Sequence, residues 1–268
     1  MEQQLRLPLG HAHSNTVFAQ FDEKIAVYSY GNALDYDPKE KNLDLERHAI
    51  TDFTRPPATR AWSVLWQRLA NDGFPEERFT IERFKSTPMH HERFVTINHK
   101  RRDGVILDQK EDAVAMTSRD CPILVLYRRS GGPVAVLHCS RSSLTGIDLG
   151  EPERSVIHEA FRLLGPDFGQ AHDACGILTM GIGAPHFHNE RYPAIIADLR
   201  KRYGTAVVGG TTDRPTIDLY AWVQAQVKVH GMDPKCIVSD GLDTFTDERL
   251  ASVRAKRGGH NLTIVVRA

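Results

Sequence analysis

Two short apolar segments separated by a glycine pair constrain the fold of this 268-residue chain more than any other feature. Residues 122–127 (PILVLY) and 133–139 (PVAVLHC) each read as a strand, and Gly131-Gly132 between them suits a tight turn. Both segments are apolar at nearly every position rather than at alternate ones. They therefore predict neighbouring antiparallel strands in a sheet that is covered on both faces.

Strand and helix patterns alternate along the rest of the chain. Strands are predicted at 93–97, 103–108, 176–183, 205–210 and 261–268, with one more that begins at about 113 and precedes the strand at 122–127. Helices are predicted at 61–71, 153–164, 191–203 and 219–231. Residues 16–31 alternate enough for one or two further strands. This mixture predicts an α/β or α+β fold with layered mixed sheets flanked by helices. We expect one domain over residues 1–268, with a divergent segment at about 1–60.

The composition disfavours several classes of function. Lys and Arg number 34, as do Asp and Glu, so the basic footprint of a nucleic-acid-binding protein is missing. No apolar run approaches the roughly 18 residues of a membrane span, and the N-terminus lacks the apolar segment of a secretory signal. The four cysteines contain no C-x-x-C and are expected as thiols. We expect a cytoplasmic protein with a small-molecule partner, and the sequence does not indicate an oligomeric state.

Cys121 and His138 are the first candidates for chemistry. Cys121 stands at the entry to one predicted strand and His138 at the exit of the next, 17 residues later. Antiparallel pairing would bring the thiol and the imidazole to the same end of the sheet. Such a pair can be a nucleophile with its base. Together with a second imidazole from His90 or His91, it can also form a zinc site with an open fourth position. Alternatively, neither residue has a chemical role: Cys121 is then a small buried apolar residue, and His138 is a hydrogen-bonded residue at the end of its strand.

Several short motifs resemble the laccase-domain family, first described as multicopper polyphenol oxidases and now as purine nucleoside phosphorylase-like. The segments PMHHERFV, DGVIL, TSRDCPILVL and AVLHCSRSS stand where the family has Q-V-H-G-x-x-V, D-A-L-V-T, T-A-D-C-x-P-V-L-L and A-A-V-H-A-G-W-R-G. GILTMGIGAPHFHN and DERLASVRAKRGGHNLTI stand at two further family segments, so the resemblance covers roughly residues 60–268. It implies a fold similar to that of the cytotoxic necrotizing factors.

The resemblance also implies a cofactor and an activity. In the family one zinc ion is bound by residues that fall here on His90, Cys121 and His138, whereas His91 is the competitor of His90. Family members cleave adenosine, inosine, guanosine or methylthioadenosine with phosphate, and deaminate adenosine. A nucleoside and phosphate are therefore the expected partners, and the three ligands are the expected catalytic residues.

The residues around the expected metal site depart from the family pattern. The Trp and Arg of H-A-G-W-R-G are replaced, and Arg141 stands one place earlier. Candidate substrate-binding residues are Arg119 and Arg141 for phosphate, Asp120 as general acid, and His186 and His188, which would point to one side of an extended segment. For Arg141, His186 and His188, the alternative is an ordinary solvated position without a role in binding.

Two other functions remain open. Chemoreceptor glutamine deamidases, whose fold is similar, use a Cys nucleophile followed within about 20 residues by its His, so a metal-free Cys–His hydrolase or deamidase also fits Cys121 and His138. His90 discriminates between the two, because only the zinc site needs it. The altered motif also allows a degenerate paralogue that binds a ligand without turnover. A copper oxidase of this type needs many histidine ligands that are grouped at short spacings. Here only His11/His13, His90/His91 and His186/His188 are closely spaced, so a copper oxidase is disfavoured.

Overall fold

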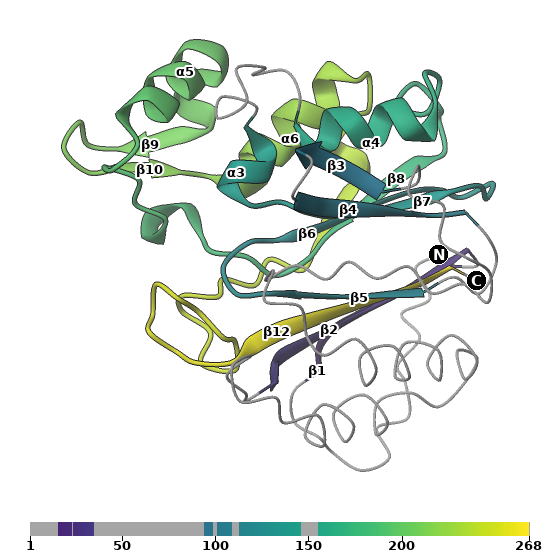
Figure 1. Ribbon diagram of the computed structural model, residues 1–268, viewed down its shortest axis with the longest axis horizontal. Coiled ribbons are helices and arrows are strands. Elements are labelled where there is room, and N and C mark those ends of the chain that lie inside the picture. Colours follow the sequence, from purple (N-terminus) through teal and green to yellow (C-terminus); the bar gives the residue numbers. More distant parts are fainter. Residues whose placement is uncertain are drawn as a thin grey trace.

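The structure is a computed structural model that describes residues 16–22, 24–34, 94–98, 101–108, 113–145 and 155–267. The predicted helix at 61–71 and the candidate ligands His90 and His91 lie outside these residues. The described part contains two large sheets, with helices on one side of the larger sheet (Figure 1). The predicted class, layered mixed sheets flanked by helices, is confirmed.

The larger sheet has six strands in the order β11-β8-β6-β7-β4-β3. Its strands are β3 (Phe94–Asn98), β4 (Arg101–Leu107), β6 (Ile123–Arg128), β7 (Val134–His138), β8 (Ala174–Leu178) and β11 (Ile237–Ser239). All neighbours are antiparallel except β11 and β8, which are parallel. The predicted antiparallel pair is confirmed as β6 and β7. Gly131 and Gly132 between them have φ values of 97° and 113°, which a residue with a Cβ rarely adopts.

The smaller sheet joins the N-terminal part of the chain to the C-terminal strand. Its order is β1-β2-β12-β5, from β1 (Thr16–Asp22), β2 (Ile25–Leu34), β12 (His260–Arg267) and β5 (Ala113–Ser118). One or two strands were expected within residues 16–31, and two are present, of which β2 extends to Leu34 and pairs with β12 along most of its length.

The core explains why β6 and β7 are apolar on both faces. Alternate residues such as Ile123 and Val136 face the smaller sheet and pack with its Val27, Met116 and Val265. The residues between them, such as Leu137, join a second cluster with the helices. Both faces of the central strands are buried, and burial of apolar surface is the main favourable contribution to folding.

Three of the four α-helices in the described residues begin after a side chain that caps them, whereas the other begins with Pro193. The helices are α3 (Arg141–Leu144), α4 (Val156–Leu164), α5 (Pro193–Tyr203) and α6 (Leu219–Val229), with short 3-10 turns η3 (Ala184–His186), η4 (Gly204–Ala206) and η5 (Pro234–Cys236). Asp218 accepts a hydrogen bond from the backbone N–H of Ala221 at the start of α6, and Ser155 caps α4 in the same way. None of the helices in the described ranges is long and apolar enough to cross a membrane.

Two predicted strands are shorter than expected. The strand predicted at 176–183 ends at Leu178, because the following residues bond to loops instead of to a strand: Ile182 N–H donates to the carbonyl of Asp120 at 2.8 Å. The strand predicted at 205–210 is reduced to β9 (Val208–Gly210) by η4, and β9 pairs with β10 (Pro215–Ile217) in a separate two-stranded sheet. The loop after Leu178 is what positions the candidate site.

Candidate functional site

Cys121 and His138 lie at the same end of two neighbouring strands. Ile123 of β6 is opposite His138 of β7, and the N–H of Cys139 donates to the carbonyl of Pro122 at 2.9 Å. His138 is buried, whereas Cys121, in the bend before β6, is partly exposed. None of the chain's four cysteines, all of them in the described residues, forms a disulfide. We call this end of the sheet, with residues 119–122, 138–141, 179–189 and 240–257, the site edge.

The serines that replace the family motif after His138 build a capped turn. Ser140 accepts a hydrogen bond from the N–H of Ser143 at 3.0 Å and caps the start of α3. The hydroxyl of Ser143 donates to the carbonyl of His138 at 2.6 Å. These bonds fix the backbone at the point where His138 leaves its strand.

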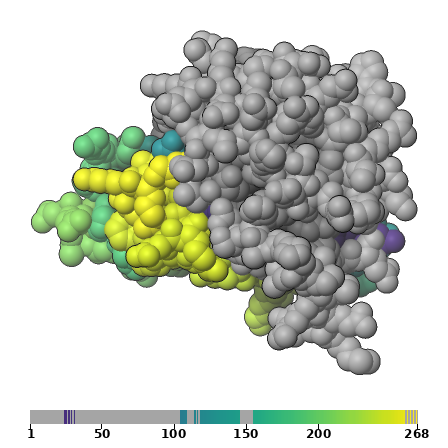
Figure 2. All heavy atoms as spheres, turned by 90° about the horizontal axis from the view of Figure 1, so that it is seen from below, coloured from purple at the N-terminus to yellow at the C-terminus, as the bar shows by residue number. Residues whose placement is uncertain are grey.

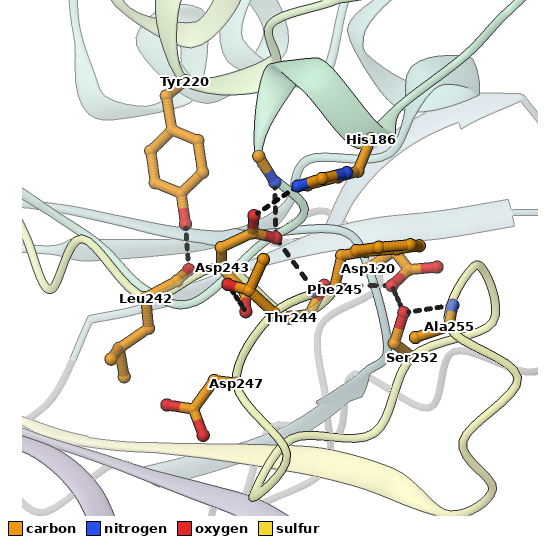
Figure 3. Close-up of polar contacts among 12 residues, drawn as sticks. Asp120, His186, Tyr220, Leu242, Asp243, Thr244, Phe245, Asp247, Ser252 and Ala255 are labelled. Carbon is orange, nitrogen blue, oxygen red and sulfur yellow. Dashed lines mark hydrogen bonds and ion pairs between the residues drawn. The ribbon is translucent and has the colours of Figure 1, made fainter.

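Asp120 ties the loop at 240–257 to the residue before Cys121. Its Oδ1 accepts hydrogen bonds from the hydroxyls of Thr244 at 3.0 Å and Ser252 at 2.6 Å (Figure 3). Its Oδ2 accepts one from the N–H of Arg254 at 3.1 Å. The residue is buried, at 7% exposure. Both oxygens of Asp120 are therefore used to hold the loop, which is a positioning role.

His186 forms a second polar pair in the site edge. Its Nε2 lies 3.6 Å from Oδ2 of Asp243, and its ring is stacked on Phe245 with a centroid distance of 4.1 Å and an interplanar angle of 10°. Asp243 is itself fixed, because its Oδ1 accepts hydrogen bonds from the N–H groups of Gly183 and Phe245, each at 2.9 Å. A Cβ on Gly183 would lie 2.6 Å from the carboxylate, so only glycine permits this approach.

Arginine side chains surround the turn at residues 187–192. The Arg141 guanidinium carbon is 3.4 Å from the ring centroid of Tyr192, and its NH1 donates to Asn189 at 3.1 Å. Arg254 donates to the carbonyl of His188 at 3.0 Å. Figure 2 shows yellow atoms of the C-terminal part of the chain beside green atoms from earlier in the sequence. The turn therefore lies among positive charges.

His186 and His188 do not share one side of an extended segment, so that prediction was wrong. His186 lies in η3, where Pro185 and the hydrogen bond from Gly183 to Asp243 turn the chain. His188 instead lies beside Arg214, with Nε2 3.3 Å from its NH2 group. The two imidazoles therefore have different partners.

Most of the chain matches one known protein family. A family model described as multi-copper polyphenol oxidoreductase laccase matches residues 67–268, which is 202 of the 268 residues. The chain belongs to this family. The expected resemblance over roughly residues 60–268 is thus confirmed.

Solved structures support the fold of this laccase-family protein. The Neisseria meningitidis protein NMB0706, of the DUF152 family, has a TM-score of 0.50 at 19% identity, and the match covers 62% of this chain and 64% of that chain. Bacillus licheniformis YfiH, described as hypothetical, has a TM-score of 0.50 at 14% identity, with 62% and 61% covered. Neither match reaches two thirds of the neighbour's own chain. A search of curated proteins found no match.

The structure thus brings together most of the predicted site residues. Cys121, His138, Asp120, Arg141, His186 and His188 all lie in the segments of the site edge, although their recorded side-chain partners differ. Arg119 lies in the same bend, where its carbonyl accepts a hydrogen bond from Asn261 at 2.9 Å. His90 is outside the described residues, and within these residues no group of three or more His, Cys, Asp or Glu side chains could hold a metal.

The site edge also contains residues that the sequence did not single out. Asp243, Arg254, Ser252 and Asp240 all come from the loop at 240–257. For Asp240 and Asp243 the local signal was the acidic and glycine-containing segment SDGLDTFTDE, which reads equally well as a solvated loop. Ser252 and Arg254 lie in the family segment DERLASVRAKRGGHNLTI, which gave neither residue a role. Their partners lie far away along the chain.

Asp240 of this laccase-family protein carries a buried carboxylate. Its Oδ1 accepts a hydrogen bond from the N–H of Leu242 at 3.0 Å, and Oδ2 is buried with no hydrogen-bond partner among the described residues. Burial raises the pKa of Asp240 from 3.8 to about 6, although the amides of Leu242 and Met180 oppose this shift. The ionised form is thus destabilised in the folded state.

This shift predicts a pH-dependent effect of Asp240→Asn. Between pH 3.8 and about 6 the folded protein keeps a proton that the unfolded chain loses, so the stability contributed by Asp240 falls as pH rises through this window. Asparagine removes this cost, and we expect the free energy of unfolding at pH 7.5 to rise by about 2 kcal/mol. At pH 3.5 the variant should equal the wild type. Urea unfolding at both pH values measures this, with the exposed Asp213→Asn as control. An equal gain at both pH values would contradict the assignment.

Proposed function

We propose that this protein is a zinc-dependent enzyme that acts on purine nucleosides, by phosphorolysis of adenosine, inosine, guanosine or methylthioadenosine, by deamination of adenosine, or by both. One observation carries the proposal. The antiparallel pairing of β6 and β7 places Cys121 and His138, the two described members of the expected ligand set, at the same sheet end. Family membership over residues 67–268 supports it.

The donor chemistry at the site edge fits zinc. A thiolate and an imidazole are ligands that zinc prefers, and a third ligand from His90 would leave the fourth position open, as catalytic zinc requires. Zinc bound there would lower the pKa of a bound water toward about 7 and supply hydroxide at neutral pH. The capped turn after His138 and the network of Asp120 would hold the two described ligands in place.

Arginine side chains at the site edge suit the phosphate. Arg141 is held in one orientation by Tyr192 and Asn189, and a guanidinium that is fixed in this way is suited to bind an oxyanion. Arg119 stays a second candidate, two residues before Cys121. We add Arg254, which lies over the ring of Phe187 at 5.3 Å and so borders the same turn.

A nucleoside panel tests the proposal. Wild type and His138→Ala are incubated with adenosine, inosine, guanosine and methylthioadenosine, with and without phosphate, and both free base and ammonia are measured. We expect turnover by the wild type that is lost in His138→Ala. Turnover unaffected by His138→Ala would place the chemistry elsewhere.

Metal analysis of the purified protein separates the alternatives. Zinc near one ion per chain supports the proposal, and copper in its place would overturn it. A metal-free protein whose Cys121 reacts with iodoacetamide would instead indicate a Cys–His hydrolase or deamidase. Zinc with no nucleoside turnover would indicate a ligand-binding paralogue.

A further inference from the structure

We propose that His186, oriented by Asp243 and Phe245, is the general acid that protonates the purine leaving group, a role that rests on the proposed function in its phosphorolysis form. Nucleoside cleavage needs such an acid, because the departing base carries negative charge unless a proton reaches it. The sequence offered only Asp120 for this task.

Asp120 is poorly suited to donate a proton. Both of its oxygens accept hydrogen bonds, from Thr244, Ser252 and the N–H of Arg254, and the residue is buried. A proton on Oδ2 would lose the hydrogen bond from the N–H of Arg254, and a proton on Oδ1 would force the hydroxyl of Thr244 or Ser252 to turn from donor to acceptor, so proton donation by Asp120 would disturb the bonds that hold the loop. Asp120 therefore serves as the acceptor that anchors the loop, and both of its oxygens are already engaged there.

His188 is also unsuited to this role. Its Nε2 lies 3.3 Å from NH2 of Arg214, and a guanidinium can only donate, so Nε2 must accept this hydrogen bond. Protonation of His188 would remove this acceptor and place two positive charges against each other. Among the described histidines of the site edge, His138 is an expected zinc ligand, which leaves His186.

The surroundings of His186 are those of an oriented proton donor. The carboxylate of Asp243 faces Nε2 at 3.6 Å, and the ring lies flat on Phe245, so both the tilt and the rotation of the imidazole are restricted (Figure 3). The negative charge of Asp243 balances the positive charge of the ring when it is protonated. Nε2 is the nitrogen that faces Asp243, which leaves Nδ1 for a substrate, and the side chain as a whole is 30% exposed.

The loop at 240–257 ties this pair to the expected zinc ligands. Asp243 faces His186, and the next residue, Thr244, donates to Asp120, which precedes Cys121. A second connection runs through Ile182, whose N–H donates to the carbonyl of Asp120, and through Gly183, whose N–H donates to Asp243. His186 is therefore fixed to the same edge as Cys121 by two short chains of bonds.

In the proposed phosphorolysis, one bond forms at C1′, one bond breaks there, and one proton moves from His186 to the base. A phosphate oxygen forms a bond to C1′ of the ribose while the bond from C1′ to N9 breaks, and its electron pair passes to the purine. Nδ1–H of the His186 imidazolium transfers its proton to N7 of the purine. The products are the neutral base and ribose 1-phosphate, and His186 regains a proton from solvent.

A substrate that needs no proton provides the test. Methylation of N7 gives the base a fixed positive charge, so 7-methylguanosine requires no acid, whereas guanosine does. We expect His186→Gln to lower kcat/KM about 100-fold for guanosine, in the range usual for loss of a general acid, and less than about threefold for 7-methylguanosine. If another nucleoside is cleaved faster, that nucleoside and its N7-methyl counterpart are compared.

Two further variants control the test. Asp243→Asn keeps an oxygen that can accept from Gly183 and Phe245 but removes the charge beside His186, and should show the same selectivity with a loss of about tenfold. His172→Gln removes an exposed imidazole beside Asp173 at the opposite end of β8, and it should leave kcat/KM unchanged for both substrates.

Each outcome bears on the inference. Equal losses on both substrates in folded His186→Gln protein, or no loss on either, would overturn the role of His186 and leave the proposed function standing. If the wild type only deaminates adenosine, the role of His186 as general acid is overturned, whereas the proposal that the protein is an enzyme acting on purine nucleosides stands. A wild type that acts on no nucleoside overturns both. If His186→Gln does not fold, the comparison is decided by Asp243→Asn.

Discussion

Cys121→Ser is expected to lower the zinc content from about one ion per chain to less than about a tenth, and nucleoside turnover by at least about 100-fold. Cysteine binds zinc as a thiolate, and a zinc ion can displace the proton of a thiol at neutral pH but not the proton of a serine hydroxyl, which is far less acidic. Two imidazoles alone hold zinc weakly. The bend before β6 is fixed by Asp120 and by the bond from Cys139 to Pro122, so serine should not disturb the backbone.

Elemental analysis after dialysis against metal-free buffer, together with the nucleoside assay, measures this result. Cys236→Ser is the matched control, because Cys236 is also partly buried but precedes β11 at the opposite end of the sheet from Cys121. It should keep both zinc and turnover. Zinc that remains stoichiometric in Cys121→Ser would show that this thiol is no ligand, even if turnover is lost.

The strands that carry Cys121 and His138 could be predicted because their signals are local. Two apolar segments around Gly131-Gly132 determine a hairpin whichever fold surrounds it, and the hairpin alone places the thiol beside the end of β7. The helix start at Asp218 was predictable for the same reason, since a cap is a property of a few consecutive residues.

The rest of the site edge depends on contacts between distant parts of the chain. Asp120 bonds to residues that lie 124 to 134 positions later, and no periodicity or motif records such a pairing. The same holds for Asp243, which faces His186 from the loop at 240–257 and turns the segment that was expected to be extended. Tertiary hydrogen bonds overrode local preference there.

Asp120→Asn is expected to lower the free energy of unfolding by about 3 kcal/mol, because three hydrogen bonds to an ionised, buried carboxylate are weakened together. Asparagine has one accepting oxygen. If that oxygen keeps Thr244 and Ser252, the new NH2 group faces the N–H of Arg254, and two donors oppose each other. If the amide is reversed, NH2 faces the hydroxyls, of which Ser252 also accepts from the N–H of Ala255.

Urea unfolding at pH 7.5 measures the loss of stability, and trypsin cleavage reports on the loop. Residues 249–257 contain Arg249, Arg254, Lys256 and Arg257, so a loop released from Asp120 should be cut faster at these sites. The exposed Asp167→Asn, which makes the same change of charge, should alter neither result. Because Asp120 precedes Cys121, we expect the Asp120→Asn variant to show both faster trypsin cleavage of the loop and a lower zinc content. A variant with the stability and cleavage rate of the wild type would show that the carboxylate does not anchor the loop that holds Asp243 against His186.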